Sequence, residues 1–269
     1  MLFIQALIDK DLNIFTSTTF YLKLKYLFCE NNMIFQEKPY EILTVYIAFG
    51  AIILVNMYFI YKVLKQERKW INYQFSGVLI SVIVGLTISL ITRPITDILL
   101  KEISFEFTIF FLAFGPMFML TFCISFLNSI KSKDIISKKI QGVLLLVFGI
   151  ILSFSFLLNG VIVLPDGLIN MSLTYYLYIL LVLSIGIVIP MYYLALGVIY
   201  KNLDNERLKK KWRIFMVGVT ILLSEIYSVL TSNTFYNPIL FSILIFVNFI
   251  FSLVGVYLIY YGVGKEFKS

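Results

Sequence analysis

Seven long apolar stretches, separated by short polar loops, constrain the fold of this chain more than any other feature of its sequence. Each has the roughly 17–25 residues that a helix needs to cross the hydrocarbon core of a bilayer. Only 14% of the residues are charged, and they gather between the stretches, which is not the pattern of a soluble protein. We therefore predict an all-α bundle of seven transmembrane helices. The stretches are residues 42–61, 75–92, 107–127, 141–164, 175–200, 214–230 and 239–262.

The positive charges alternate between the two sides of the predicted bundle. Most of the 22 lysines and arginines follow the first, third and fifth stretches or lie in the C-terminal tail. Loops rich in lysine and arginine stay on the cytoplasmic side of a membrane. We therefore expect a multi-pass protein of the cell membrane with its N-terminus outside and its C-terminus inside. The net charge of +7 then reflects topology and attraction to anionic lipid, and no nucleic-acid partner is expected.

The chain divides into three parts. Residues 1–40 are too polar to span a membrane. They form an extracytoplasmic segment at the membrane interface. Alternatively, translation starts at Met33, and only a short segment precedes the first helix. Residues 41–264 form the transmembrane domain, and residues 265–269 form a short cytoplasmic tail. Cys29 and Cys123 are expected on opposite sides of the bilayer, so a disulfide between them is not predicted.

Missing residue types exclude several kinds of chemistry. The chain has no histidine, which removes bis-histidine haem ligation, the usual zinc sites and histidine proton relays. The last stretch has no lysine to bind retinal as a Schiff base. A nucleophilic serine turn with a base and a glycine-rich phosphate loop are also missing. We therefore predict no catalytic residue, no metal, no cofactor and no enzymatic activity.

Charged residues near or inside the membrane are candidates for a ligand site, because such side chains are unfavourable in hydrocarbon unless they face the bundle interior. Glu225 lies inside the sixth stretch, and Arg93 and Asp97 lie at the outer end of the second. With Tyr227, they are predicted to line an outward-facing pocket, in which Arg93 and Glu225 form an ion pair. The alternative is that Arg93 reaches the lipid headgroups while Glu225 is protonated or bonded to tyrosine.

Two prolines interrupt predicted helices near the middle of the membrane. Pro116 and Pro190 each remove one intrahelical hydrogen bond, so each is expected to form a static kink or a hinge. Asn56 and Asn248 lie near the centres of the first and seventh stretches, which are neighbours if the helices form a closed ring. Hydrogen bonding between helices is their predicted role.

The loop before the sixth stretch is strongly basic. Lys209, Lys210, Lys211 and Arg213 flank a tryptophan, Trp212. This segment is either a topological anchor with an interfacial tryptophan or a surface on which a cytoplasmic signalling protein or lipid headgroups dock. The two roles are compatible.

Several short segments from the third stretch onward resemble the N-terminal seven-transmembrane sensor region of many histidine kinases. They are residues 113–116 (Ala-Phe-Gly-Pro), the basic loop at 204–211 and the Asn237-Pro238 entry to the last stretch. The resemblance implies a membrane sensor that passes a signal along its seventh helix. No kinase region or phosphoacceptor histidine follows that helix in this sequence, so a separate protein is expected to receive the signal.

The predicted function is therefore that of a membrane sensor or receptor without an output domain, whose partners are the lipid bilayer and a cytoplasmic signalling protein. The alternative is a transporter or channel subunit in which Glu225 binds a proton or a cation. The lack of an internal repeat weighs against the transporter. A membrane-embedded enzyme is a third class, for which the sequence has no acid, base and nucleophile set.

Overall fold

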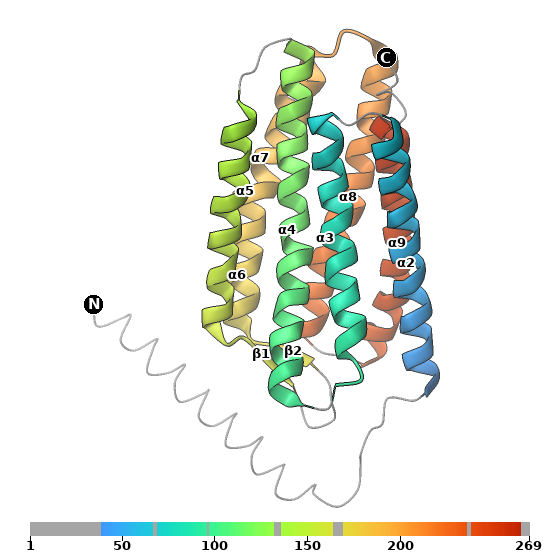
Figure 1. Ribbon diagram of the computed structural model, residues 1–269, viewed down its shortest axis with the longest axis vertical. Helices are drawn as coiled ribbons and strands as arrows, with labels where there is room; N and C mark the ends of the chain where they lie inside the picture. The colour runs from blue at the N-terminus through green and yellow to red at the C-terminus, as the bar shows by residue number, and fades with distance from the viewer. Residues whose placement is uncertain are drawn as a thin grey trace, which may run out of the picture. The chain divides into compact units, whose positions relative to one another are not determined.

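The computed structural model describes residues 39–66, 69–95, 97–131, 136–163, 169–235 and 238–264, which are almost entirely helical (Figure 1). Within them, six helices are long and apolar enough to cross a membrane, so the predicted all-α, multi-pass membrane protein is confirmed at that level. These spans are Val45–Lys65, Trp70–Thr92, Ile98–Lys131, Lys138–Leu158, Leu173–Asn202 and Glu206–Thr234. The predictions for residues 1–38, Cys29 and the tail at 265–269 lie outside the described residues.

The last predicted stretch forms α9, Pro238–Ile259, followed by a π-helical turn, η5, at Tyr260–Gly264. Its described apolar part, Phe246–Gly262, is shorter than the other six spans. Glycines bring this helix very close to α8, Glu206–Thr234. A Cβ atom at Gly218 would lie 2.8 Å from the Gly255 carbonyl oxygen, so the two backbones meet where only glycine fits.

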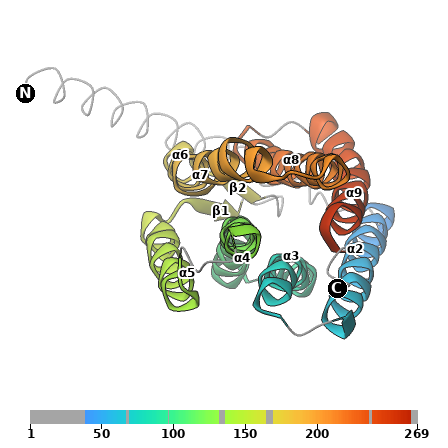
Figure 2. The ribbon, with the colours of Figure 1, turned by 90° about the horizontal axis from the view of Figure 1, so that it is seen from above.

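The remaining helices pack in sequence order. Helices α2 (Pro39–Gln66), α3 (Trp70–Thr92), α4 (Ile98–Lys131) and α5 (Lys138–Ser153) each contact the next. Helix α9 contacts both α8 and α2, which closes the ring that Figure 2 shows end-on. Helix α4 is the most buried of the six spans, since it contacts α3, α5, the fifth span and α8.

The fifth span is helical throughout but contains two π-helical segments. It runs through α6 (Leu173–Leu183), π-helix η2 (Ser184–Val188), α7 (Ile189–Tyr192), π-helix η3 (Tyr193–Ile199) and a 3₁₀ turn, η4 (Tyr200–Asn202). The two π-helical segments lie on either side of Pro190, which has no N–H group for the regular hydrogen-bond pattern. Wider turns keep the backbone bonded there, as at the Ile189 N–H, which donates to the Ser184 carbonyl.

The fourth predicted helix ends earlier than expected. Helix α5 ends at Ser153, a 3₁₀ turn (η1, Phe154–Leu158) follows, and residues that were predicted to continue the helix form strand β1, Val161–Val163. Asn159 adopts a left-handed conformation with φ of 43°, which stops the helical winding. Three β-branched residues then pair antiparallel with β2, Ile169–Met171, in the register Val161↔Met171.

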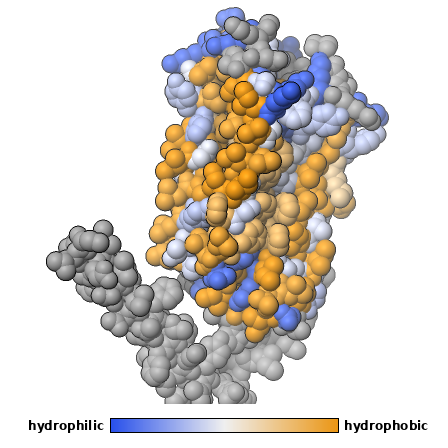
Figure 3. Space-filling view, turned by 60° about the vertical axis from the view of Figure 1, so that its left-hand side comes forward, coloured by the Kyte–Doolittle hydropathy of each residue, from blue (hydrophilic) through white to orange (hydrophobic). Residues whose placement is uncertain are grey.

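Large apolar side chains cover the outside of the helices. Leu54, Leu157 and Tyr193 are each about two-thirds exposed or more. Figure 3 shows hydrophobic residues over the middle of the bundle on the face in view, with hydrophilic residues gathered toward the upper end. Such a surface suits the hydrocarbon of a bilayer and would be unfavourable in water.

Candidate functional site

A cavity of about 160 Å³ lies between six helices of the bundle. Its wall is built by α2, α3, α4, α7, α8 and α9, with residues such as Ile52, Leu86, Ile109, Met191, Val219 and Val256. Along α8 it extends from Val219 to Asn233, which corresponds to roughly 21 Å of helix. A cavity of this size is large enough for a small organic molecule, because an apolar cavity of about 150 Å³ already accepts benzene.

The structure brings several predicted functional residues to this one cavity. Arg93, Pro116, Glu225 and Asn248 come from four different helical regions, and all four line it. The sequence did not indicate that Pro116 and Asn248 belong to the same pocket as Arg93 and Glu225. Only the packing of α3, α4, α8 and α9 places these residues around a common space. The pocket hypothesis therefore has a geometric basis in the described part of the chain.

Glu225 lies about 14 Å from the C-terminal end of α8. Its carboxyl group is within hydrogen-bonding reach of Ser252 on α9, which is itself buried and also lines the cavity. Ser252 thus takes the place in which Arg93 was expected. Part of the Glu225 side chain is accessible, and because the residue lines the cavity, it is available to an occupant.

Arg93 caps the C-terminus of α3, at one end of the cavity. Ser89, Ser232 and Asn233 line the same end. The opposite end is formed by apolar residues, including Val78, Met119 and Val219. The cavity therefore has a polar end, an acid partway along its length and an apolar floor.

Asp97 and Tyr227 do not line the cavity. The Asp97 carboxylate is exposed and accepts a hydrogen bond of 2.8 Å from the Leu100 N–H in the first turn of α4. The Tyr227 hydroxyl lies 2.8 Å from the Ser184 hydroxyl, in the first π-helical segment of the fifth span. Asp97 thus caps a helix, and Tyr227 links two helices.

Pro116 is buried in α4, and the helix continues on both sides of it from Ile98 to Lys131. It has no N–H group to donate to the carbonyl of Leu112, four residues earlier, and both residues line the cavity. Pro190 is the second residue of the short helix α7, between the two π-helical segments. Asn56 is fully buried and donates a 2.8 Å hydrogen bond to Ile52 of its own helix, whereas a bond to another helix was expected.

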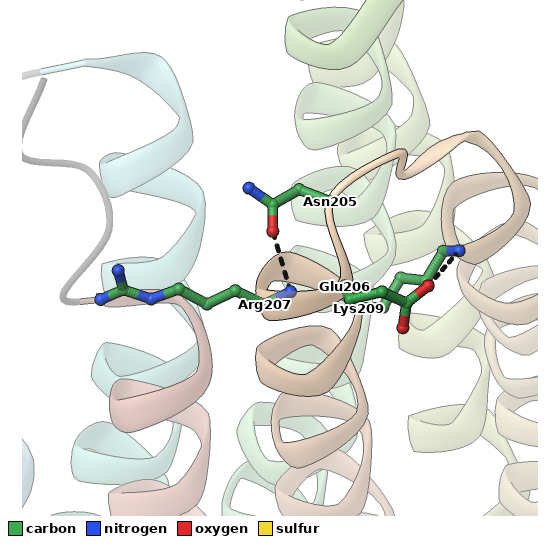
Figure 4. A network of polar contacts seen from close by, with 4 residues as sticks. All are labelled: Asn205, Glu206, Arg207 and Lys209. Carbon is green, nitrogen blue, oxygen red and sulfur yellow. Dashed lines mark hydrogen bonds and ion pairs between the residues drawn. The ribbon is translucent and has the colours of Figure 1, made fainter.

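The basic segment begins α8. The Asn205 side chain caps the helix by accepting a hydrogen bond of 2.8 Å from the Arg207 N–H, and Lys209 pairs with Glu206 at 2.8 Å (Figure 4). Lys210 and Arg213 are exposed, and the Arg213 guanidinium lies 5.7 Å from the centre of the Tyr200 ring. The helix therefore presents positive charge at this end of the bundle.

Trp212 is buried inside the bundle, so it is not the interfacial tryptophan that the anchor interpretation expects. Its ring lies 4.7 Å from that of Phe126 and 4.8 Å from that of Phe215. Its indole N–H donates to the Ala195 carbonyl, within the second π-helical segment, at 2.9 Å. This residue links the start of α8 to the fifth span.

Glu106 comes just before the predicted stretch at 107–127 in the sequence. Helix α4 begins at Ile98, so Glu106 lies two turns inside the helix and is only 8% exposed. Glu102, one turn earlier, accepts a hydrogen bond of 3.0 Å from the Val163 N–H of the hairpin. The i, i+4 spacing of the two acids next to the apolar residues 107–127 was the signal that could have placed them on one helix face.

No protein-family model, no curated protein and no solved structure matches the chain. The resemblance to the sensor region of histidine kinases therefore stays a prediction.

Proposed function

We propose that this chain is a receptor-like membrane protein that binds a small ligand in the cavity lined by Glu225 and signals through a separate cytoplasmic protein. The observation that carries the proposal is the cavity itself, which contains an acid deep between helices and a basic residue at one end. Ionisable groups in such positions are typical of functional sites in membrane proteins.

The proposed topology has seven spans, with the hairpin end outside and the basic end inside. It is supported by the placement of β1 and β2 at one end of the bundle and the start of α8 at the other (Figure 1). The polar end of the cavity, with Arg93, is then on the outer side. A ligand would enter from outside the cell or from the outer half of the membrane.

A route from the cavity to the inner side is provided by α8. This helix carries both Glu225 and the basic segment at 209–213, which lie roughly 18–24 Å apart along its axis. Trp212 connects the same end of α8 to the π-helical part of the fifth span, and Met191 of that span lines the cavity. A ligand that favours one packing of these helices would shift the position of the basic segment.

The proposal is tested by mild-detergent affinity purification of the tagged protein from its native membranes. Val82 lines the cavity, so Val82→Phe would fill it. Ile80 is 47% exposed and lies outside the cavity, so Ile80→Phe is the matched control. A third variant changes Lys209, Lys210 and Lys211 to Ala.

We expect one cytoplasmic protein to co-purify with the wild type and with Ile80→Phe. It should be lost from the triple-alanine variant, and its amount should change in Val82→Phe. The same set of co-purifying proteins in all four preparations would contradict the proposal.

A transporter that uses Glu225 as a proton or cation site is the second candidate. It is favoured by the contact between Glu225 and Ser252, which places two oxygen-bearing side chains together inside the cavity. Flux of protons or sodium ions into liposomes that requires Glu225 and is lost in Glu225→Gln would favour this candidate over the receptor.

A further inference from the structure

We propose that the cavity selects a lipophilic amine, a molecule with a hydrocarbon body and a positively charged ammonium group that pairs with Glu225. This inference rests on the proposed ligand-binding function and gives its ligand a chemical class. It follows from the position of the acid, the aromatic side chains around the cavity and the apolar character of its floor.

The depth of Glu225 decides which charge the cavity favours. The carboxylate lies within the cavity beside the neutral side chain of Ser252, while Arg93 lies at the helix end, at the polar rim. Arg93 is partly buried as well, but it lies at the end of the cavity, whereas Glu225 lies partway along it, next to the apolar floor. A head group whose hydrocarbon body fills that floor therefore lies against the acid, and the natural partner of the acid is a cation.

Aromatic side chains strengthen this preference. Phe49, Phe105 and Phe249 line the cavity from three different helices, α2, α4 and α9. The face of an aromatic ring attracts a cation, and rings of this kind surround the ammonium group in many binding sites. An acid together with several phenylalanines suits an alkylammonium group better than a metal ion, which requires more oxygen ligands.

The rest of the cavity suits a hydrocarbon chain. Between Glu225 and Val219 the α8 wall continues for about 9 Å, with Leu222 and Leu223 among the lining residues. Since lipid tails are as apolar as these side chains, a chain gains little by leaving the membrane for the cavity. Selectivity must then come from the ammonium group and from the fit of the chain.

Equilibrium binding of tritiated hexylamine to the protein in nanodiscs of neutral phosphatidylcholine tests the inference, because a six-carbon chain fits the roughly 9 Å of wall beyond Glu225. Hexanol and hexanoate serve as competitors with chains of the same carbon number and with a neutral or an anionic head. The comparison on the wild-type protein requires no mutation, so a folding defect cannot obscure it. We expect one saturable site, competed by unlabelled hexylamine and about tenfold or more weakly by hexanol and hexanoate.

Two pairs of variants locate the site. Glu225→Gln should weaken hexylamine binding about tenfold or more, because the ion pair inside the cavity is lost. Glu106→Gln removes another buried acid that does not line the cavity, so it should bind like the wild type. Val82→Phe should abolish saturable binding, and Ile80→Phe should retain it.

Equal competition by hexanol, or tighter binding of hexanoate that depends on Arg93, would overturn the preference for a cation. Such a result would leave the cavity as a ligand site and the proposed function intact. Absence of any saturable binding of the three probes would overturn the inference, while the co-purification experiment would still decide the receptor proposal independently.

Discussion

At the scale of single residues, Gly160 shows how closely the hairpin packs on the bundle. A Cβ atom added there would lie 2.1 Å from the Cβ atom of Tyr175, whose side chain is fully buried. We therefore expect Gly160→Ala to destabilise the protein by about 1–3 kcal/mol, the usual effect of overpacking a core. Thermal unfolding in detergent, followed by the loss of monodisperse protein on size-exclusion chromatography, measures the change.

Gly142 provides the matched control, because a Cβ atom there meets nothing within 4 Å. Gly142→Ala should be neutral or stabilising by roughly 0.5–1 kcal/mol, since alanine favours a helix interior. An unchanged melting temperature in Gly160→Ala would show that the hairpin does not pack on Tyr175 as described.

The sequence was informative about which residues matter and less informative about their partners. Glu225 and Arg93 stand out in an apolar chain, and both line the cavity. The partner of Glu225 was beyond prediction, because Ser252 is one of many serines and only the close glycine contact of α8 with α9 brings it near. The burial of Trp212 likewise depends on packing against Phe126, which lies far away in the sequence.

At the scale of helices, Gln141 joins three elements at once. Its side-chain oxygen accepts hydrogen bonds from the Trp70 indole at 2.7 Å and from the Ser125 hydroxyl at 2.8 Å, and its amide donates to the Ile136 carbonyl at 3.1 Å. We expect Gln141→Leu to destabilise the protein by about 1–3 kcal/mol, because it leaves buried donors without an acceptor. Thermal unfolding compared with Ser125→Ala, which removes a single bond, measures this.

Because both substitutions remove the same hydrogen bond, the double variant should lose less stability than the sum of the two single ones. Full additivity would contradict a network in which Ser125 and Gln141 share that bond.

Helix boundaries were the least predictable feature at this scale. The apolar run at 107–127 was recognised as a helix. Its earlier start at Ile98 was not, because the charged residues Glu102 and Glu106 lower the hydropathy of the first turns of α4. Conversely, the run at 141–164 looked continuous although Asn159 and Gly160 end the helix before it is complete. Hydropathy alone does not separate an apolar strand from the end of an apolar helix.

For the whole molecule, the proposed topology makes opposite ends of the bundle accessible from opposite sides of the membrane. Ile162 is an exposed residue of the hairpin and Asn205 is exposed at the start of α8. In a chain with Cys29→Ser, the remaining Cys123 is fully buried and should not react. A membrane-impermeant maleimide should then label Ile162→Cys on intact cells and Asn205→Cys only after the cells are permeabilised. Labelling of Asn205→Cys on intact cells, and of Ile162→Cys only after permeabilisation, would show the opposite topology.

The central claim is that the cavity lined by α2, α3, α4, α7, α8 and α9 holds a ligand next to Glu225. Photolabelling of the protein in nanodiscs with a diazirine-bearing hexylamine, followed by mass spectrometry of its peptides, tests this most directly. We predict modified residues around the cavity, such as Leu223, Ile226 and Asn248, with labelling lost in Val82→Phe and retained in Ile80→Phe. Labels confined to lipid-facing residues such as Leu54 and Ile185, with the same yield in both variants, would contradict the claim.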